Sequence, residues 1–199
     1  CLCYNKTAKW YGSCRKLISS DDLVFSSGCQ GLVEHSHSVP TTGFLLWENY
    51  FAMEEQVDVG MVKVIRISNF NCKQIDGLLS KPDSKYKPAN NQIESHPYLL
   101  QVELIPFCQS KGIFVTVYHP FGPEDVSLFD DPQVKEIALM HSKIAARVLI
   151  WLQIQRNMSL IPRSITPHCT KENIKVTLQN LTLTQRNPLW SRTKYSLHI

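Results

Sequence analysis

The feature that most constrains this chain is a regular alternation of strand patterns with helix patterns over residues 47 to 176. Four short stretches are rich in β-branched and apolar residues, which is typical of strands: Val62–Ile67, Asn90–Glu94, Ile113–Tyr118 and Met158–Ile161. Between them, apolar residues recur at helical spacing. Strands that alternate with helices pair in parallel, because each helix carries the chain back to the edge where the strand began. The pattern predicts an α/β fold.

Residues that begin or end helices mark the segments between these strands. Gly60 is expected to end a helix that starts near Trp47, and Asp131 is expected to cap a helix that opens with Pro132. Pro106 would cost up to about 3 kcal/mol inside a helix, but less within its first turns. After Gly60, the expected helices are Cys72–Ser80, Leu99–Ser110, Pro132–His141, Ala145–Arg156 and one opening at Thr166.

Two architectures satisfy this alternation, a (β/α)₈ barrel and an open doubly wound sheet. No G-x-G-x-x-G follows any of the four strands, which disfavours a dinucleotide-binding sheet of the doubly wound kind. The pattern therefore favours a partial (β/α)₈ TIM barrel of about four βα units within residues 47–199. Residues 1–46 show no sustained period, and we expect them to form a degenerate or poorly ordered segment.

Charge, cysteine content and hydropathy exclude several classes of protein. The 21 basic and 17 acidic side chains give a net charge of +4 without a basic run, which disfavours nucleic-acid binding. Seven scattered cysteines without a C-x-x-C pair predict neither a metal site nor a disulfide framework. The longest apolar run, Val148–Leu152, is far shorter than the roughly 20 residues of a membrane span. We expect a cytoplasmic protein without a membrane segment.

Polar residues gather where the expected strands end. They are Ser68 and Asn69 after the first strand, Gln92 and Glu94 on the second, Tyr118 at the end of the third, and Arg163 and Ser164 after the fourth. The carboxyl ends of barrel strands all open on the functional face. Polar residues also end strands simply because loops are solvated. The pattern alone leaves both interpretations open.

Four sequence motifs favour the interpretation that these strand ends form a functional face. They read Arg66-Ile67-Ser68-Asn69-Phe70-Asn71, Asn91-Gln92-Ile93-Glu94-Ser95-His96-Pro97-Tyr98, Val117-Tyr118-His119-Pro120-Phe121-Gly122 and Ile161-Pro162-Arg163-Ser164-Ile165-Thr166-Pro167. In order and spacing, from about Ala52 to Val176, they resemble the aldo-keto reductases, in the branch of aldose reductase and the hydroxysteroid dehydrogenases. The resemblance implies a (β/α)₈ barrel and NADP(H)-dependent reduction of aldehydes and ketones to alcohols.

The resemblance also implies roles for particular residues. Ser68, Asn69 and Gln92 match the residues that hold the nicotinamide carboxamide, and Tyr118 matches the ring that stacks on the nicotinamide. Arg163, Ser164 and Thr166 match the contacts of the 2′-phosphate, and Glu172 and Asn173 match the adenine contacts. The expected cofactor is NADP, and the expected partner is a small-molecule carbonyl compound.

The family's catalytic Tyr, Lys, Asp and His find no matching position in this sequence. Two interpretations follow. In the first, the chain is a truncated aldo-keto reductase whose full-length product reduces carbonyls. In the second, it is a non-catalytic remnant, like the product of a decayed or alternatively spliced gene, that binds nucleotide weakly at most. Under either, we expect no carbonyl reduction by this chain alone. An unclosed barrel leaves open sheet edges, so we expect a monomer or an aggregation-prone chain.

Overall fold

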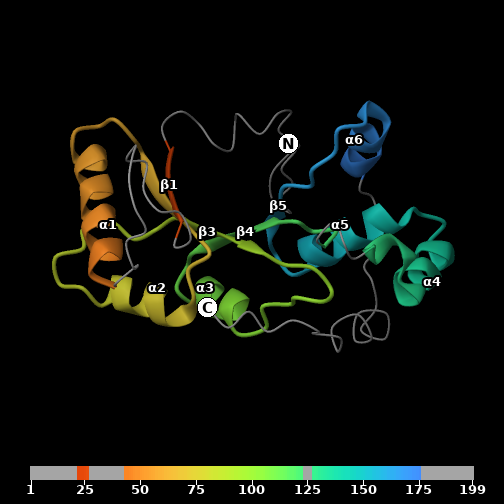
Figure 1. Cartoon of the computed structure of the whole chain (residues 1–199), viewed down its shortest axis with the longest axis horizontal. Helices are drawn as coiled ribbons and strands as arrows, with labels where there is room; N and C mark the ends of the chain where they lie inside the picture. Colours follow the sequence, from red (N-terminus) through yellow and green to blue (C-terminus); the bar gives the residue numbers. More distant parts are fainter. Residues whose placement is uncertain (1–21, 27–42, 123–126, 176–199) are drawn as a thin grey trace, which may run out of the picture. The chain divides into compact units, whose positions relative to one another are not determined.

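The structure is a computed structural model, and it describes residues 22–26, 43–122 and 127–175. Strands and helices alternate along these residues (Figure 1). In chain order the elements are β1 (Asp22–Ser26), α1 (Gly43–Asp58), β2 (Val64–Ser68), α2 (Cys72–Leu79), β3 (Asn90–Glu94), α3 (Leu104–Ser110), β4 (Phe114–Tyr118), η2 (Leu128–Asp130), α4 (Pro132–Met140), α5 (Ala145–Gln155), β5 (Ser159–Leu160) and α6 (Pro167–Ile174).

Each described strand pairing is parallel. In one compact unit, residues 18–93 with 103–115, β2 pairs with β1 on one side and with β3 on the other. In the second unit, which includes residues 94–102 and 116–199, β4 pairs with β5. Within each unit, strands that follow one another in the sequence are therefore neighbours. This arrangement confirms the α/β fold predicted from the alternation and is that of part of a (β/α)₈ barrel.

The expected boundaries are largely confirmed. Strand β3 has the predicted bounds, and Asp131 caps α4 through hydrogen bonds from the backbone N–H groups of Gln133 and Val134. Gly60 follows α1 with φ +74°, the left-handed conformation that glycine adopts at low cost. Asn71 begins α2 with a reciprocal capping box to Gln74.

Three expectations are corrected. The helix predicted from Leu99 begins only at Leu104, because His96 and Leu99 first form an antiparallel bridge through two backbone hydrogen bonds. Pro106 is then the third residue of α3, where a missing N–H breaks no helical bond. Strand Asp22–Ser26 was not assigned, although it pairs with β2 over its whole length. Helix α1 also starts at Gly43, before the expected Trp47.

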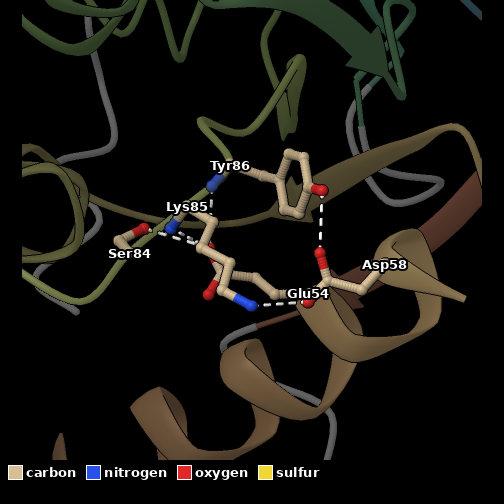
Figure 2. A network of polar contacts seen from close by, with 5 residues as sticks. All are labelled: Glu54, Asp58, Ser84, Lys85 and Tyr86. Atoms are coloured by element: carbon tan, nitrogen blue, oxygen red, sulfur yellow. Dashed lines mark hydrogen bonds and ion pairs between the residues drawn. The ribbon is translucent and has the colours of Figure 1, made fainter.

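One face of α1 holds the segment that leads into β3. Tyr50, Glu54 and Asp58 stand four residues apart, so they lie along one stripe of the helix. They bind Tyr86 in three ways: Tyr50 donates its hydroxyl proton to the carbonyl of Tyr86, Glu54 accepts from its N–H, and Asp58 accepts from its hydroxyl. Figure 2 shows Glu54 and Asp58 in this network, with Ser84 and Lys85.

The second unit has a core built by its helices. Val148, Leu149 and Leu152 of α5 are fully buried and pack with Val134 and Ile137 of α4. Among the described residues, no single helix is long and apolar enough to cross a membrane; α4 and α5 reach that length only together, bent by 90°.

Candidate functional site

The carboxyl ends of β2 and β3 bring Ser68, Asn69 and Gln92 together. Ser68 lies opposite Gln92 in the register of these strands. The carbonyl of Gln92 accepts two hydrogen bonds, one from the Ser68 hydroxyl at 3.0 Å and one from the Asn69 N–H at 2.9 Å. Asn69 reaches this position with φ +59°, which asparagine tolerates better than most residues. The structure thus assembles all three residues that the sequence assigned to the carboxamide.

The chemistry of these side chains suits a carboxamide. Ser68 gives its hydroxyl proton to the Gln92 carbonyl, so the oxygen keeps lone pairs that can accept from an amide N–H. The side-chain amide of Gln92 is half-buried, forms no hydrogen bond with the described residues, and carries both donors and an acceptor. A ligand that itself presents one carbonyl and one NH₂ group therefore finds complementary partners here.

The second unit contains the remaining assigned residues. Tyr118 is the last residue of β4. The parallel pairing of β4 with β5 is extended by one hydrogen bond, from the Ile161 N–H to the Val117 carbonyl at 2.9 Å. Tyr118 and the segment that begins with Ile161 consequently leave the sheet at the same edge. The Tyr118 ring is half-buried and meets the ring of His119 edge-on, with 5.2 Å between centroids.

The start of α6 has the features of an anion site. Thr166 is the N-cap, but its side chain makes no capping hydrogen bond, and Pro167 takes the first helical position. Ser164 folds back and accepts from the Thr166 N–H at 3.3 Å. The Arg163 side chain is exposed and forms no ion pair with the described residues. A helix start that its own side chain does not cap, with a guanidinium before it, suits a phosphate group.

Glu172 has a structural role that the sequence did not indicate. Its carboxylate pairs with Arg147 of α5 and with Lys175, 3.1 Å away, and the hydrogen bond from Lys175 is the main cause that lowers its pKa. Arg147 also donates to the Glu172 backbone carbonyl at 3.2 Å, so α5 fixes α6 at this point. Asn173 is buried. The adenine contacts assigned to these two residues stay predictions.

Three ionisable residues meet at the strand ends outside the assigned set. The Glu94 carboxylate lies 3.5 Å from Nε2 of His96 and 3.6 Å from Nδ1 of His119. All three belong to motifs that end strands, and that position was the available clue to them.

Metal and thiol chemistry receive no support from the described part of the chain. There, no group of three His, Cys, Asp or Glu side chains is arranged to hold a metal ion. Cys72, Cys108 and Cys169 are free thiols. Burial raises the pKa of the first two, which disfavours their reactive thiolate form.

Parallel βα units with polar residues gathered at the strand ends are characteristic of the class of βα-barrel proteins. Comparison with known proteins narrows this class. Residues 32–124 match the model of the Aldo/keto reductase family. Over these residues the chain is therefore similar to the aldo-keto reductase family.

Several curated relatives extend this match. The chain is 45% identical over 137 residues to aldo-keto reductase family 1 member A1-A of Danio rerio, an alignment that covers 65% of this chain and 42% of the relative. It is 41% identical over 139 residues to prostaglandin-E(2) 9-reductase of Oryctolagus cuniculus. It is 40% identical over 137 residues to aldo-keto reductase family 1 member A1 of Homo sapiens. Both alignments also cover 65% of this chain and 42% of the relative. The chain spans less than half the length of these relatives.

Proposed function

We propose that this chain binds NADP(H) and serves the reduction of small aldehydes or ketones to alcohols. The observation that carries the proposal is the start of α6, where Arg163 stands exposed before a helix end that Thr166 leaves without a side-chain cap. A guanidinium and free helical N–H groups bind a phosphate monoester, the group that distinguishes NADPH from NADH. When bound, NADPH supplies the hydride, and the residues of the chain hold and orient it.

Within the other unit, the chemistry at the ends of β2 and β3 suits the carboxamide group of such a nucleotide. Ser68, Asn69 and Gln92 offer acceptors and donors to a carboxamide, as the resemblance to the family implies. The half-buried ring of Tyr118 offers an aromatic face for stacking. We further propose that the protein acts in the cytosol, where scattered cysteines stay reduced, as a monomer or an aggregation-prone chain without nucleic-acid or membrane partners.

The test is a fluorescence titration of the full chain with NADPH and with NADH. A charge-assisted phosphate contact is worth about 1.5–3 kcal/mol, so Arg163→Ala should weaken NADPH binding by about tenfold or more and leave NADH binding unchanged. Arg163→Lys should retain most of the affinity, and Lys135→Ala, on the exposed face of α4, is the matched control. Equal affinities for the two nucleotides, or an unchanged Arg163→Ala, would contradict the proposal.

A second candidate function is nucleotide binding without catalysis. It is favoured by the lack of any residue in this sequence that matches the family's catalytic Tyr, Lys, Asp or His. The two candidates share the titration above and differ in whether the chain contains its own proton donor.

A further inference from the structure

The segment that leads into α6, within the second unit, is exposed. Residues 165–169 are all exposed, and Ile165 is 90% exposed. Thr166 lies directly before the helix, with an extended backbone at φ −91° and ψ 119°. The Thr166 side chain is therefore accessible to another protein, and the chain is already extended at this residue.

The backbone of Thr166 is held in place while its side chain is free. Its N–H donates to the Ser164 hydroxyl oxygen at 3.3 Å, and its carbonyl accepts from the N–H of Thr170 at 3.0 Å. The Thr166 hydroxyl makes no hydrogen bond with the described residues and does not cap α6. The neighbouring hydroxyls of Ser164 and Thr170, in contrast, both donate to the Thr166 carbonyl. In this segment, the Thr166 hydroxyl can therefore react without first breaking a hydrogen bond.

Proline follows Thr166 directly, and no other serine or threonine of the sequence precedes a proline. Proline restricts the residue before it to extended conformations, in agreement with the backbone at Thr166. Protein kinases select their substrates by the residues that flank the acceptor hydroxyl. A kinase that requires proline after the acceptor therefore finds one candidate site in this chain.

The residues around Thr166 suit a phosphate group. No acidic side chain occurs in residues 161–171, and Arg163 is exposed without an ion pair to the described residues. Glu172 is the next carboxylate along the chain, and Arg147 already pairs with it. A phosphate attached to threonine carries a charge of about −1.5 to −2 and three acceptor oxygens. The Arg163 guanidinium and the uncapped N–H groups at the start of α6 are suitable donors to these oxygens.

We propose that Thr166 is a phosphorylation site and that its phosphate group takes the place of the 2′-phosphate of NADPH. The second part rests on the proposed function, which assigns the 2′-phosphate to Arg163 and the start of α6. In the transfer, Oγ1 of Thr166 attacks the γ-phosphorus of Mg²⁺-bound ATP, the bond from that phosphorus to the bridging oxygen breaks, ADP leaves, and the kinase takes the hydroxyl proton. Two phosphate groups at one site repel each other. Phosphorylation therefore lowers the affinity for NADPH and affects NADH, which lacks the 2′-phosphate, much less.

The first experiment incubates the full chain with Mg²⁺, ATP and a mitogen-activated protein kinase, and measures the phosphate per chain by mass spectrometry. Wild type should gain one phosphate, which fragmentation should locate at Thr166. Thr166→Val should gain none, and Thr170→Val, in the first turns of α6, is the matched control that should still gain one. A wild-type chain that stays unmodified, or a Thr166→Val chain modified as fully as wild type, overturns the inference.

The second experiment titrates NADPH and NADH into the unmodified chain, the phosphorylated chain and the phosphorylated chain after treatment with a phosphatase. Phosphorylation should weaken NADPH binding about tenfold or more, the usual worth of a charge-assisted contact, and change NADH binding less than about threefold. The phosphatase should restore NADPH binding. A phosphorylated chain that binds NADPH as tightly as the unmodified chain refutes the competition. An unmodified chain that binds both nucleotides equally refutes the proposed function instead and leaves the result of the first experiment unaffected.

The third experiment tests the contact with Arg163 without any nucleotide, by phosphorus-31 magnetic resonance of the phosphorylated chain. The second pKa of a phosphothreonine is about 6, and a guanidinium beside the group favours the dianion, so the phosphate should titrate below that pH. Arg163→Ala should move the titration back toward about pH 6, and Lys135→Ala, on the exposed face of α4, should not. The same titration in phosphorylated wild type and in phosphorylated Arg163→Ala would contradict the contact.

Discussion

Replacement of Glu54 should destabilise the unit that carries β2 and β3 far more than replacement of its neighbours. A single carboxylate oxygen of Glu54 accepts three hydrogen bonds, from the backbone N–H groups of Lys85 and Tyr86 at 2.9 Å and from the Ser84 hydroxyl at 3.2 Å (Figure 2). The side chain is 3% exposed, so water cannot readily take over these bonds. The segment it holds leads directly into β3.

The magnitude follows from the nature of these bonds. A hydrogen bond to a charged acceptor contributes about 1.5–3 kcal/mol, and a neutral one about 0.5–1.5 kcal/mol. Glu54→Gln keeps the shape and an acceptor oxygen but removes the charge, so we expect a loss of about 1–3 kcal/mol. Glu54→Ala also leaves two backbone N–H groups without an acceptor, so its loss should be larger. With a urea dependence of about 2 kcal/mol per molar, a 2 kcal/mol loss lowers the unfolding midpoint by about 1 M.

The measurement is urea unfolding followed by far-ultraviolet circular dichroism. Two matched controls lie on the same helix. Glu55→Gln changes an exposed carboxylate, and Asp58→Asn removes an exposed ion pair to Lys85 whose atoms are only 2.6 Å apart. Solvent screens such exposed pairs, so both controls should unfold like the wild type. If Asp58→Asn lowered the midpoint as much as Glu54→Gln, burial would not be the source of the effect, and the reasoning would be refuted.

Two further predictions concern the second unit. Asp131 caps α4 and also accepts a 2.6 Å hydrogen bond from the Tyr98 hydroxyl. In urea unfolding, Asp131→Ala should lower the free energy of unfolding by about 1–3 kcal/mol, and Tyr98→Phe should lower it by only about 1 kcal/mol. Equal losses for the two variants would contradict the capping role of Asp131. Burial holds the pKa of His96 below its ordinary value of 6.5, so the unfolded chain takes up the proton first as the pH falls. Stability should therefore decline as the pH drops below about 6.5, and His96→Asn should flatten this decline in urea midpoints measured between about pH 7.5 and pH 5.5; an unchanged slope would exclude His96 as its cause.

The sequence predicted most of the described helices and strands because local conformational preferences agree with tertiary packing in these elements. The Asp131-Pro132 start of α4 and Gly60 after α1 each specify a helix end by a short-range mechanism. Strand β1 was missed because its five residues lie among serines and carry no extended pattern, and pairing with β2 decides their conformation. The start of α3 was predicted too early because the backbone bridge between His96 and Leu99 keeps the residues before Leu104 out of the helix.

The candidate site likewise contains residues that the sequence predicted and contacts that it did not predict. Ser68, Asn69 and Gln92 could be found because they follow strands in motifs of fixed spacing, and the register of β2 and β3 then brings them together. The link between Glu94 and His119 could not be found, because it depends on a positive φ that the sequence does not announce. A period-two argument even predicts the opposite orientation for His119. Long-range side-chain contacts of this kind become visible only in coordinates.

Ser68 and His119 differ in how strongly the described strands depend on their side chains. Ser68 is still part of the strand pairing, and its hydroxyl bonds the backbone of the neighbouring strand, so its replacement disturbs both fold and ligand contact. His119 lies one residue beyond β4, more than half exposed, and none of the described strand pairings depends on its side chain. Substitution at His119 should therefore cost little stability, whereas substitution at Ser68 should disturb the pairing of β2 with β3.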